Sequence, residues 1–299
     1  NGVRDSSIPF LISALLKNNN IFYIAKNDLE LSNIYNFLSQ NFTNINIFKI
    51  PAWDCLPYDI SSPNFSITSD RVKSFSKLCF FKKNKEKNIF LTTINSLITK
   101  TAPSDFYKKN FISLTNKTEY SFNKLTDFLI NTGYKRVQTV RELGEFSLRG
   151  SILDVFPIGY SKAFRIDFFG ETIETIKVMD PLTQRSSTHV ENINIYSSNE
   201  YLLSEENIEN FRKKFRSLDG NQSIKNSIYE KVSSGIKFNG IEHFLPLLHK
   251  DPLGTIFDFL PKNQEITFLL TKNFFKLIDE RELEIKHFSE EREIENSEY

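Results

Sequence analysis

The chain has 299 residues, 39% of them hydrophobic and 25% charged, and its 38 basic and 37 acidic residues leave a net charge of +1. This composition excludes a disordered or fibrous protein, and the length predicts two domains, or one domain inserted into another. The balanced charge argues against a protein whose main task is to hold a phosphate backbone. The chain begins at Asn1 and its only methionine is Met179, so we expect a piece of a longer protein.

Cysteine and histidine usage predicts a cytoplasmic protein with no metal and no cofactor. Cys55 and Cys79 are too few for a disulfide framework and form no CxxC pair, which favours a reducing compartment. His243 and His249 have no Cys or carboxylate partner at the spacing of a zinc site. No apolar run approaches 18 residues and the opening segment has no signal-peptide pattern, so we expect neither a membrane span nor secretion.

The first 115 residues alternate short apolar runs with helical patterns. Asn27 followed by Glu30 has the spacing of a capping box, and a stripe of apolar residues follows it, so a helix is expected to begin there. Strands are predicted at 21–25, 45–48 and 89–93, and a second helix at 69–81. Strands that alternate with helices predict a parallel sheet covered by helices.

Near residue 120 the pattern changes to an α+β one. Ser121 is expected to cap a helix that Gly133 ends. Five strands are predicted after it, at 144–149, 151–156, 164–169, 172–179 and 184–190. The connections at 159–161 and 170–171 are too short for a parallel crossover, so these strands should be antiparallel neighbours.

These patterns predict an inserted domain. We expect residues 120–196 to form a small α+β domain set into an outer α/β domain, which residues 1–119 begin and residues 197–299 complete. From Asp279 onward the chain has nine acids and three bases, which predicts a solvated helix or a frayed end.

Catalytic motifs are absent from the sequence. A phosphate-binding P-loop needs G-x-x-x-x-G-K-[ST], but residues 2–7 (GVRDSS) have neither the second glycine nor the lysine, and Asp5 has the wrong charge. Ser6 or Ser7 is instead expected to cap a helix. There is no G-x-S-x-G or H-E-x-x-H motif, and Asp154 and Asp167, inside strands, are expected to be surface residues or partners of nearby bases.

The predicted strand at 164–169 (FRIDFF) carries the strongest functional signal. Because side chains alternate across a strand, Phe164, Ile166 and Phe168 should face the core. Arg165 and Phe169 should then share the other face, where a large aromatic has no folding role. Arg beside an aromatic is typical of a protein-binding hot spot. The alternative is that Phe169 lies under the helix of its own domain, or in a bulge with Gly170.

Arg149 is a second candidate. Alternation along 145–149 places it outward with Glu145 and Ser147, and Gly150 permits a tight turn. The pattern indicates only an exposed arginine, which could equally pair with Glu145 and have no further role.

Several segments resemble known proteins. Residues 149–157 (RGSILDVFP), 165–174 (RIDFFGETIE) and 180–186 (DPLTQRS) closely resemble the damage-recognition region shared by UvrB and the transcription-repair coupling factors. Residues 51–59 (PAWDCLPYD), 229–235 (YEKVSSG) and 240–246 (GIEHFLP) are similar to the coupling factors, and the resemblance covers about residues 1 to 280. UvrB has an intact P-loop. The absence of a P-loop from this sequence therefore favours the N-terminal, UvrB-like module of a bacterial coupling factor.

The resemblance implies a fold and a partner. It implies an outer domain with a degenerate helicase-type α/β fold, and an inserted domain that docks UvrA, the damage-scanning ATPase. The family's two arginines and one phenylalanine for that contact fall on Arg149, Arg165 and Phe169. The parent protein would be an ATP-dependent DNA translocase whose other domains contact RNA polymerase and DNA, and whose C-terminal domain masks the UvrA-binding surface.

The sequence therefore predicts a non-catalytic adaptor that recruits UvrA where RNA polymerase has stalled at a lesion. Two alternatives remain open at this point: a degenerate ATPase, and a module that binds DNA directly. The nine basic and nine acidic residues within 120–196 predict no basic field for the second alternative.

Overall fold

The computed structural model describes residues 5–16, 19–42, 45–57, 59–80, 87–218, 222–262 and 264–297. The chain divides into two compact units, unit 1 (residues 1–101 and 254–299) and unit 2 (residues 102–253). Gly2 of the predicted degenerate loop, Tyr58 of the 51–59 motif and Phe81 at the end of the predicted second helix lie outside the described residues.

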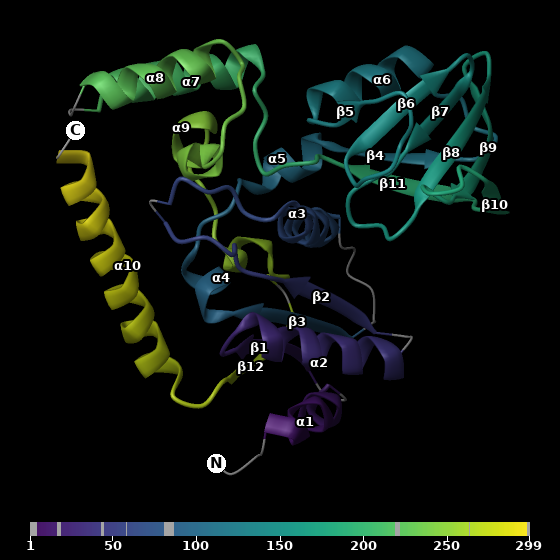
Figure 1. Ribbon diagram of the computed structural model, residues 1–299. Coiled ribbons are helices and arrows are strands. Elements are labelled where there is room, and N and C mark those ends of the chain that lie inside the picture. Colours follow the sequence, from purple (N-terminus) through teal and green to yellow (C-terminus); the bar gives the residue numbers. More distant parts are fainter. Residues whose placement is uncertain are drawn as a thin grey trace. The chain divides into compact units, whose positions relative to one another are not determined.

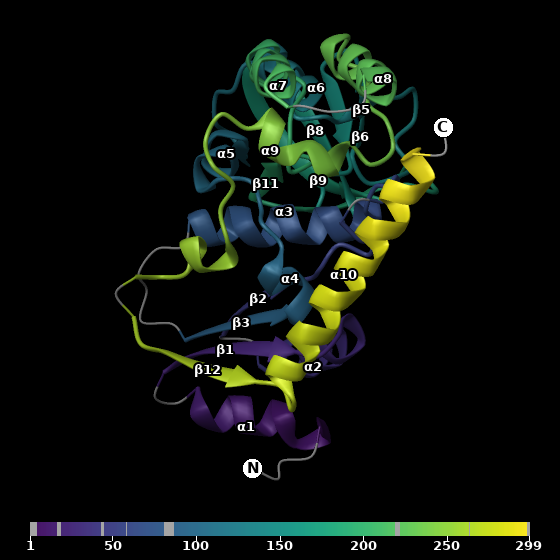
Figure 2. The same ribbon diagram turned by 90° about the vertical axis from the view of Figure 1, so that its left-hand side faces the viewer.

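Unit 1 is built on a four-stranded parallel sheet in the order β12-β1-β3-β2, which confirms the predicted parallel arrangement. Figures 1 and 2 show helices α1 and α2 on one face of this sheet and α3 on the other. The elements are a 3₁₀ turn at Asp5–Ser7, α1 (Ile8–Leu15), β1 (Asn20–Ala25), α2 (Asp28–Asn41), β2 (Asn46–Ile50), α3 (Phe65–Cys79), β3 (Asn88–Thr93), α4 (Ile94–Ile98), a 3₁₀ turn at Ile256–Phe259, β12 (Ile266–Leu270) and α10 (Phe274–Ser297).

Helix α2 begins where predicted. The Asn27 side-chain oxygen accepts a hydrogen bond from the Glu30 amide at 3.0 Å. The Glu30 carboxylate accepts a hydrogen bond from the amide of Lys26, the residue before the N-cap Asn27. It also accepts one from the Tyr23 hydroxyl, and both bonds are 2.8 Å long. Helix α3 begins four residues before its predicted start, because Asn64 caps it through the Ser66 amide.

Ser7 and Ser121 occupy the predicted N-cap positions of α1 and α6, but neither side chain makes a capping hydrogen bond. The two positions were therefore predicted correctly, but the expectation that the hydroxyls form capping hydrogen bonds was wrong. Pro9 near the start of α1 has no amide that needs a partner, which lowers the need for a cap there.

The acidic C-terminal segment forms the 24-residue helix α10. Ion pairs one turn apart support it, including Lys276–Glu280 and Lys286–Glu290. Throughout the described ranges, no helix combines the length and the apolar character needed to cross a membrane.

Unit 2 contains a six-stranded sheet in the order β10-β9-β8-β7-β6-β5, antiparallel except for the β5–β6 pair. Strands β4 and β11 form a separate antiparallel pair. The elements are α5 (Ser104–Lys109), β4 (Phe111–Thr115), α6 (Phe122–Asn131), β5 (Lys135–Arg136), β6 (Glu145–Arg149), β7 (Ile152–Val155), β8 (Ala163–Phe169), β9 (Thr172–Met179), β10 (Ser186–His189), β11 (Asn192–Tyr196), α7 (Glu205–Arg216), α8 (Gln222–Ser233), a 3₁₀ turn at Ile241–Phe244 and α9 (Leu245–Leu248).

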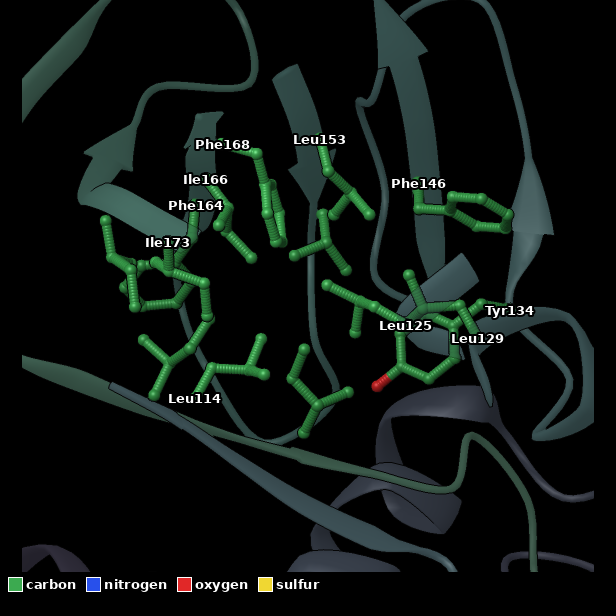
Figure 3. Close-up of a cluster of buried hydrophobic side chains, with 14 residues drawn as sticks. Leu114, Leu125, Leu129, Tyr134, Phe146, Leu153, Phe164, Ile166, Phe168 and Ile173 are labelled. Atoms are coloured by element: carbon green, nitrogen blue, oxygen red, sulfur yellow. The ribbon is translucent and has the colours of Figure 1, made fainter. Parts of the chain in front are cut away.

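The core of unit 2 lies between α6, the β4–β11 pair and one face of the large sheet. Figure 3 shows Leu125 and Leu129 of α6, Leu114 of β4 and the aromatic side chains of β8 converging on this core. Phe168 of β8 packs edge-to-face on Phe122, with ring centroids 5.2 Å apart. The core fixes which face of β8 points away from it.

Unit 2 is wider than the segment predicted at 120–196. Strand β4 precedes that segment and pairs with β11, so the unit starts earlier. Beyond β11, the Ser198 amide donates to the Thr132 carbonyl and the His249 ring lies 2.8 Å from the Glu200 carbonyl oxygen. These bonds hold residues 197–253 in unit 2, and the return to unit 1 begins at Gly254 rather than near residue 197.

Candidate functional site

The candidate site lies on the face of the large sheet that points away from the α6 core, and β8 supplies its centre. Phe164, Ile166 and Phe168 are buried in the core, whereas Phe169 is 78% exposed. The sequence prediction of an exposed Phe169 is confirmed, and the alternative of a buried ring is wrong. The register irregularity at Asp167/Phe168 lies where Asp167 faces Thr175 but Phe168 faces Ile173. The extra residue is thus on β9, and alternation along β8 is preserved.

Strand register brings the two candidate arginines to one carboxylate. Asp154 of β7 lies directly opposite Arg165 of β8, and Arg149 of β6 lies opposite Ile152, two residues before Asp154. All these pairs are antiparallel, so the side chains of Arg149, Asp154 and Arg165 share a face.

Asp154 is 1% exposed and accepts charge-assisted hydrogen bonds from both arginines. Arg165 binds it through two nitrogens, Nε to Oδ1 at 2.7 Å and Nη2 to Oδ2 at 2.9 Å. Arg149 Nη2 donates to Oδ2 at 2.9 Å. The predicted alternative, an Arg149–Glu145 pair, is wrong: the Glu145 carboxylate accepts instead from the Arg141 and Glu142 amides.

Gln184, which follows β9, also contacts both arginines. Its side-chain oxygen lies 3.5 Å from Arg149 Nη2, and its carbonyl oxygen 3.4 Å from Arg165 Nη1. Its own amide nitrogen donates to the Val140 and Pro181 carbonyls. Residues 149, 154, 165 and 184 come from three of the sequence motifs, and the fold brings these motifs together.

One end of this face is covered. Val140, Ala163 and Met179 form a small buried cluster there, against which Val137 and Phe156 pack. Ser147, predicted to point to solvent, is 1% exposed. That prediction was wrong because alternation identifies the face to which a side chain points but not what covers that face.

The charges on the open part of the face are paired but not neutral. The hydrogen bond to Asp154 raises the pKa of the Arg165 guanidinium, so its charge is permanent. For Asp167, burial raises the pKa, but hydrogen bonds from Thr175 and Lys177 outweigh it and leave the pKa below its usual value. The three cations Arg149, Arg165 and Lys177 and the two carboxylates give a net charge of +1.

The structure brings Arg149 and Arg165 together but leaves Phe169 apart from them. Phe169 is four residues from Arg165 on the same face of β8, about 13 Å along the strand. The side chain of Arg149 is 50% exposed and that of Arg165 is 20% exposed. Sequence reasoning placed Asp154 only as a surface residue or a base partner, and it missed Gln184. Their shared role depends on cross-strand register, which the local pattern does not contain.

A metal centre has no support among the residues that the structure describes, where no three His, Cys, Asp or Glu side chains gather closely enough to hold an ion. What the face presents is two arginines paired with Asp154 and the exposed ring of Phe169.

Comparison with known proteins agrees with these observations. The family described as "UvrB interaction domain" matches residues 112–201, a range that includes all the site residues. The chain is similar to the transcription-repair-coupling factor of Rickettsia bellii, with 32% identity over 93% of this chain and 26% of the relative. It is also similar to those of Haemophilus influenzae (32% identity, 78% of this chain, 20% of the relative) and Escherichia coli (30%, 77% and 20%).

The chain thus spans a fifth to a quarter of the length of these relatives, each of which it matches over most of its own length. The resemblance inferred from the motifs is confirmed, and the chain belongs to the transcription-repair-coupling factor family.

Proposed function

We propose that the chain is a non-catalytic adaptor that binds UvrA through the open face of the unit 2 sheet and so couples stalled transcription to nucleotide excision repair. The observation that carries the proposal is the 78% exposure of Phe169 on a strand whose other aromatic rings are buried. A ring exposed to water on a strand contributes nothing to the core. Its burial by a partner removes apolar surface from water, which favours binding.

The arginines support the same reading. Hot spots in protein interfaces are enriched in Arg and aromatic residues, and they gain affinity when the free protein already holds them in place. Asp154 anchors both guanidinium groups before any partner arrives. Arg149, Arg165 and Phe169 are therefore the residues that we assign to the UvrA contact.

The proposal assigns no nucleotide chemistry to unit 1, whose parallel sheet we interpret as a helicase-type fold without a working phosphate loop. A hollow of about 470 Å³ lies beside the start of α2, and Glu30 is among its lining residues. Lys26 lines the same hollow, so one side chain of each charge faces it. We prefer the adaptor to a degenerate ATPase because residues 2–7 lack the second glycine and the lysine of a P-loop.

The other functions belong, on this proposal, to parts of the parent protein outside this chain. These parts would supply the ATP-dependent translocase and the contacts with RNA polymerase and DNA, and a C-terminal domain would mask the UvrA-binding face. The net charge of +1 on the open face gives direct DNA binding little support.

The test compares the affinity of the 299-residue chain and its variants for purified UvrA. Phe169→Ala and Arg149→Ala should each weaken binding by about 30-fold, or about 2 kcal/mol, because both remove a hot-spot side chain. Ile130→Ala is the matched control, since Ile130 is a 51% exposed apolar residue on α6, outside the face. Its affinity should equal that of the wild type.

Unchanged affinity in a Phe169→Ala, Arg149→Ala double variant would remove this face from the interface. Saturable binding of labelled ATP to the chain would favour the ATPase instead, and strongly salt-dependent DNA binding would favour the DNA-binding module.

A further inference from the structure

We infer that Asp154 is a positioning residue for this surface and that Arg149, rather than Arg165, makes the direct ionic contact with a carboxylate of the partner. The inference rests on the proposed function, and it divides the three assigned residues into two that touch the partner and one that is held internally.

Asp154 itself cannot reach a partner. Its side chain is 1% exposed, and it accepts three hydrogen bonds, all from the two arginines. A buried carboxylate that holds two cations fixes their positions, and its removal leaves two guanidinium groups without their anchor. Asp154 therefore acts on the surface through Arg149 and Arg165.

The three side-chain nitrogens of Arg165 all have partners within unit 2. Nε and Nη2 bind Asp154, Nη2 also lies 3.3 Å from the Met179 sulfur, and Nη1 lies 3.4 Å from both the Gln184 carbonyl oxygen and the Ser186 hydroxyl. With 20% of the side chain exposed, Arg165 offers a partner little more than the edge of a planar group. Its main role is to complete the anchor.

Arg149 has side-chain donors that are available to a partner. Only Nη2 is engaged, by Asp154 and by Gln184, while Nε and Nη1 donate to no residue that the structure describes. Half of the side chain is exposed. A guanidinium that is held through one nitrogen and open along its other edge matches the two oxygens of a carboxylate. The partner should therefore place an Asp or Glu side chain against Arg149.

Gln184 forms a second anchor that is independent of charge. Its backbone has φ of 59°, a left-handed conformation that is uncommon for a non-glycine residue. The turn that holds it closes through Asp180, whose side chain accepts from the Leu182 and Thr183 amides. The turn thus fixes Gln184 where it meets both arginines.

The experiment is a double-mutant cycle on UvrA affinity in the 299-residue chain. Asp154→Asn keeps the shape of the side chain but removes its charge, and we expect it to weaken binding about 10-fold. Asp127→Asn is the matched control: it makes the same change of charge at an exposed position of α6, outside the face, and we expect a change below about threefold.

In an Arg149→Ala background, Asp154→Asn should cost less than about threefold, because the group through which it acts is already absent. Arg165→Ala should cost less than Arg149→Ala. Denaturant unfolding of each variant will show whether the fold persists. If Asp154→Asn does not fold, Gln184→Met removes the side-chain oxygen that meets Arg149, keeps the main-chain contact with Arg165, and should weaken binding measurably.

Wild-type affinity in a folded Asp154→Asn variant would overturn the inference, and so would an undiminished cost of Asp154→Asn in the Arg149→Ala background, which would mean that Asp154 acts on the domain as a whole. If Gln184→Met has to stand in, wild-type affinity in that variant would have the same meaning. The affinity of Phe169→Ala for UvrA separates the two proposals. If that variant binds UvrA like the wild type, the proposed function fails. If Phe169→Ala binds more weakly while Asp154→Asn keeps wild-type affinity, only the positioning role of Asp154 fails.

Discussion

His249 is an ionisable residue sealed inside unit 2. It is 4% exposed, its Nε2 lies 2.8 Å from the Glu200 carbonyl oxygen, and Phe106 packs edge-to-face on the ring at 5.0 Å. Burial lowers the pKa of the imidazole below its ordinary value of 6.5, and the hydrogen bond and charge of Glu200 offset this only in part. The folded protein thus holds His249 neutral under conditions in which the unfolded chain would protonate it.

The sign of the pH dependence follows. Because the pKa is lower in the folded state, the unfolded state binds more protons below about pH 6.5, and the free energy of unfolding falls as the pH falls through that value. Wild type should lose more stability between about pH 7.5 and pH 5.5 than His249→Gln, which keeps a donor for the Glu200 carbonyl. Urea unfolding at both pH values measures the difference, and equal losses in the two proteins would contradict the prediction.

At the scale of single residues, the sequence predicted which side chains are candidates but not what they bind. Arg149 was expected to have Glu145 as its alternative partner, because those two residues lie on one face of one strand. The actual partner, Asp154, lies on the neighbouring strand. Alternation along a strand is a local property, whereas cross-strand partners depend on a register that turn geometry and the core decide together.

At the scale of an element, β8 shows what alternation can predict. Two adjacent phenylalanines lie on opposite faces of the strand. Phe168 is 5% exposed and packs on Phe122, whereas Phe169 is 78% exposed. The pattern of apolar residues decided this correctly because the strand is regular and its core face is continuous.

The two rings should therefore separate stability from binding. Phe168→Ala should lower the free energy of unfolding by about 3–5 kcal/mol, because it leaves a cavity in the unit 2 core. Phe169→Ala should change it by less than about 0.5 kcal/mol, as a surface substitution does. Chemical denaturation of both variants measures this, and a Phe169→Ala loss close to that of Phe168→Ala would mean that the ring has a structural role.

Other elements escaped prediction for physical reasons. Strands β4 and β11 are short and pair across about 80 residues of chain, so no local turn signal joins them. β5 has two residues, and its parallel pairing with β6 depends on the loop between them. Strands joined by tight turns, such as β8 and β9, were predicted because the turn itself brings them together.

At the scale of the whole molecule, the chain leaves unit 1 and returns to it at one place. Thr101 and Gly254 form an antiparallel bridge with two hydrogen bonds of 2.9 Å, so the two ends of the intervening segment leave from neighbouring residues. Residues 102–253 between them have their own core and contain every residue of the proposed UvrA-binding face. Closely spaced ends are typical of an inserted domain that can fold by itself.

Excision of residues 102–253 should therefore give a folded fragment. We expect this fragment to unfold cooperatively and to bind UvrA within about threefold of the affinity of the 299-residue chain, since no residue of the face comes from unit 1. The complementary protein, in which a short Gly-Ser linker joins Thr101 to Gly254, should keep its parallel sheet and lose UvrA binding. Circular dichroism, denaturant unfolding and UvrA titration of both pieces provide the measurement. A folded fragment 102–253 with strongly reduced affinity would show that unit 1 contributes to the interface, and an unfolded fragment would show that the core of unit 2 depends on unit 1 for its stability.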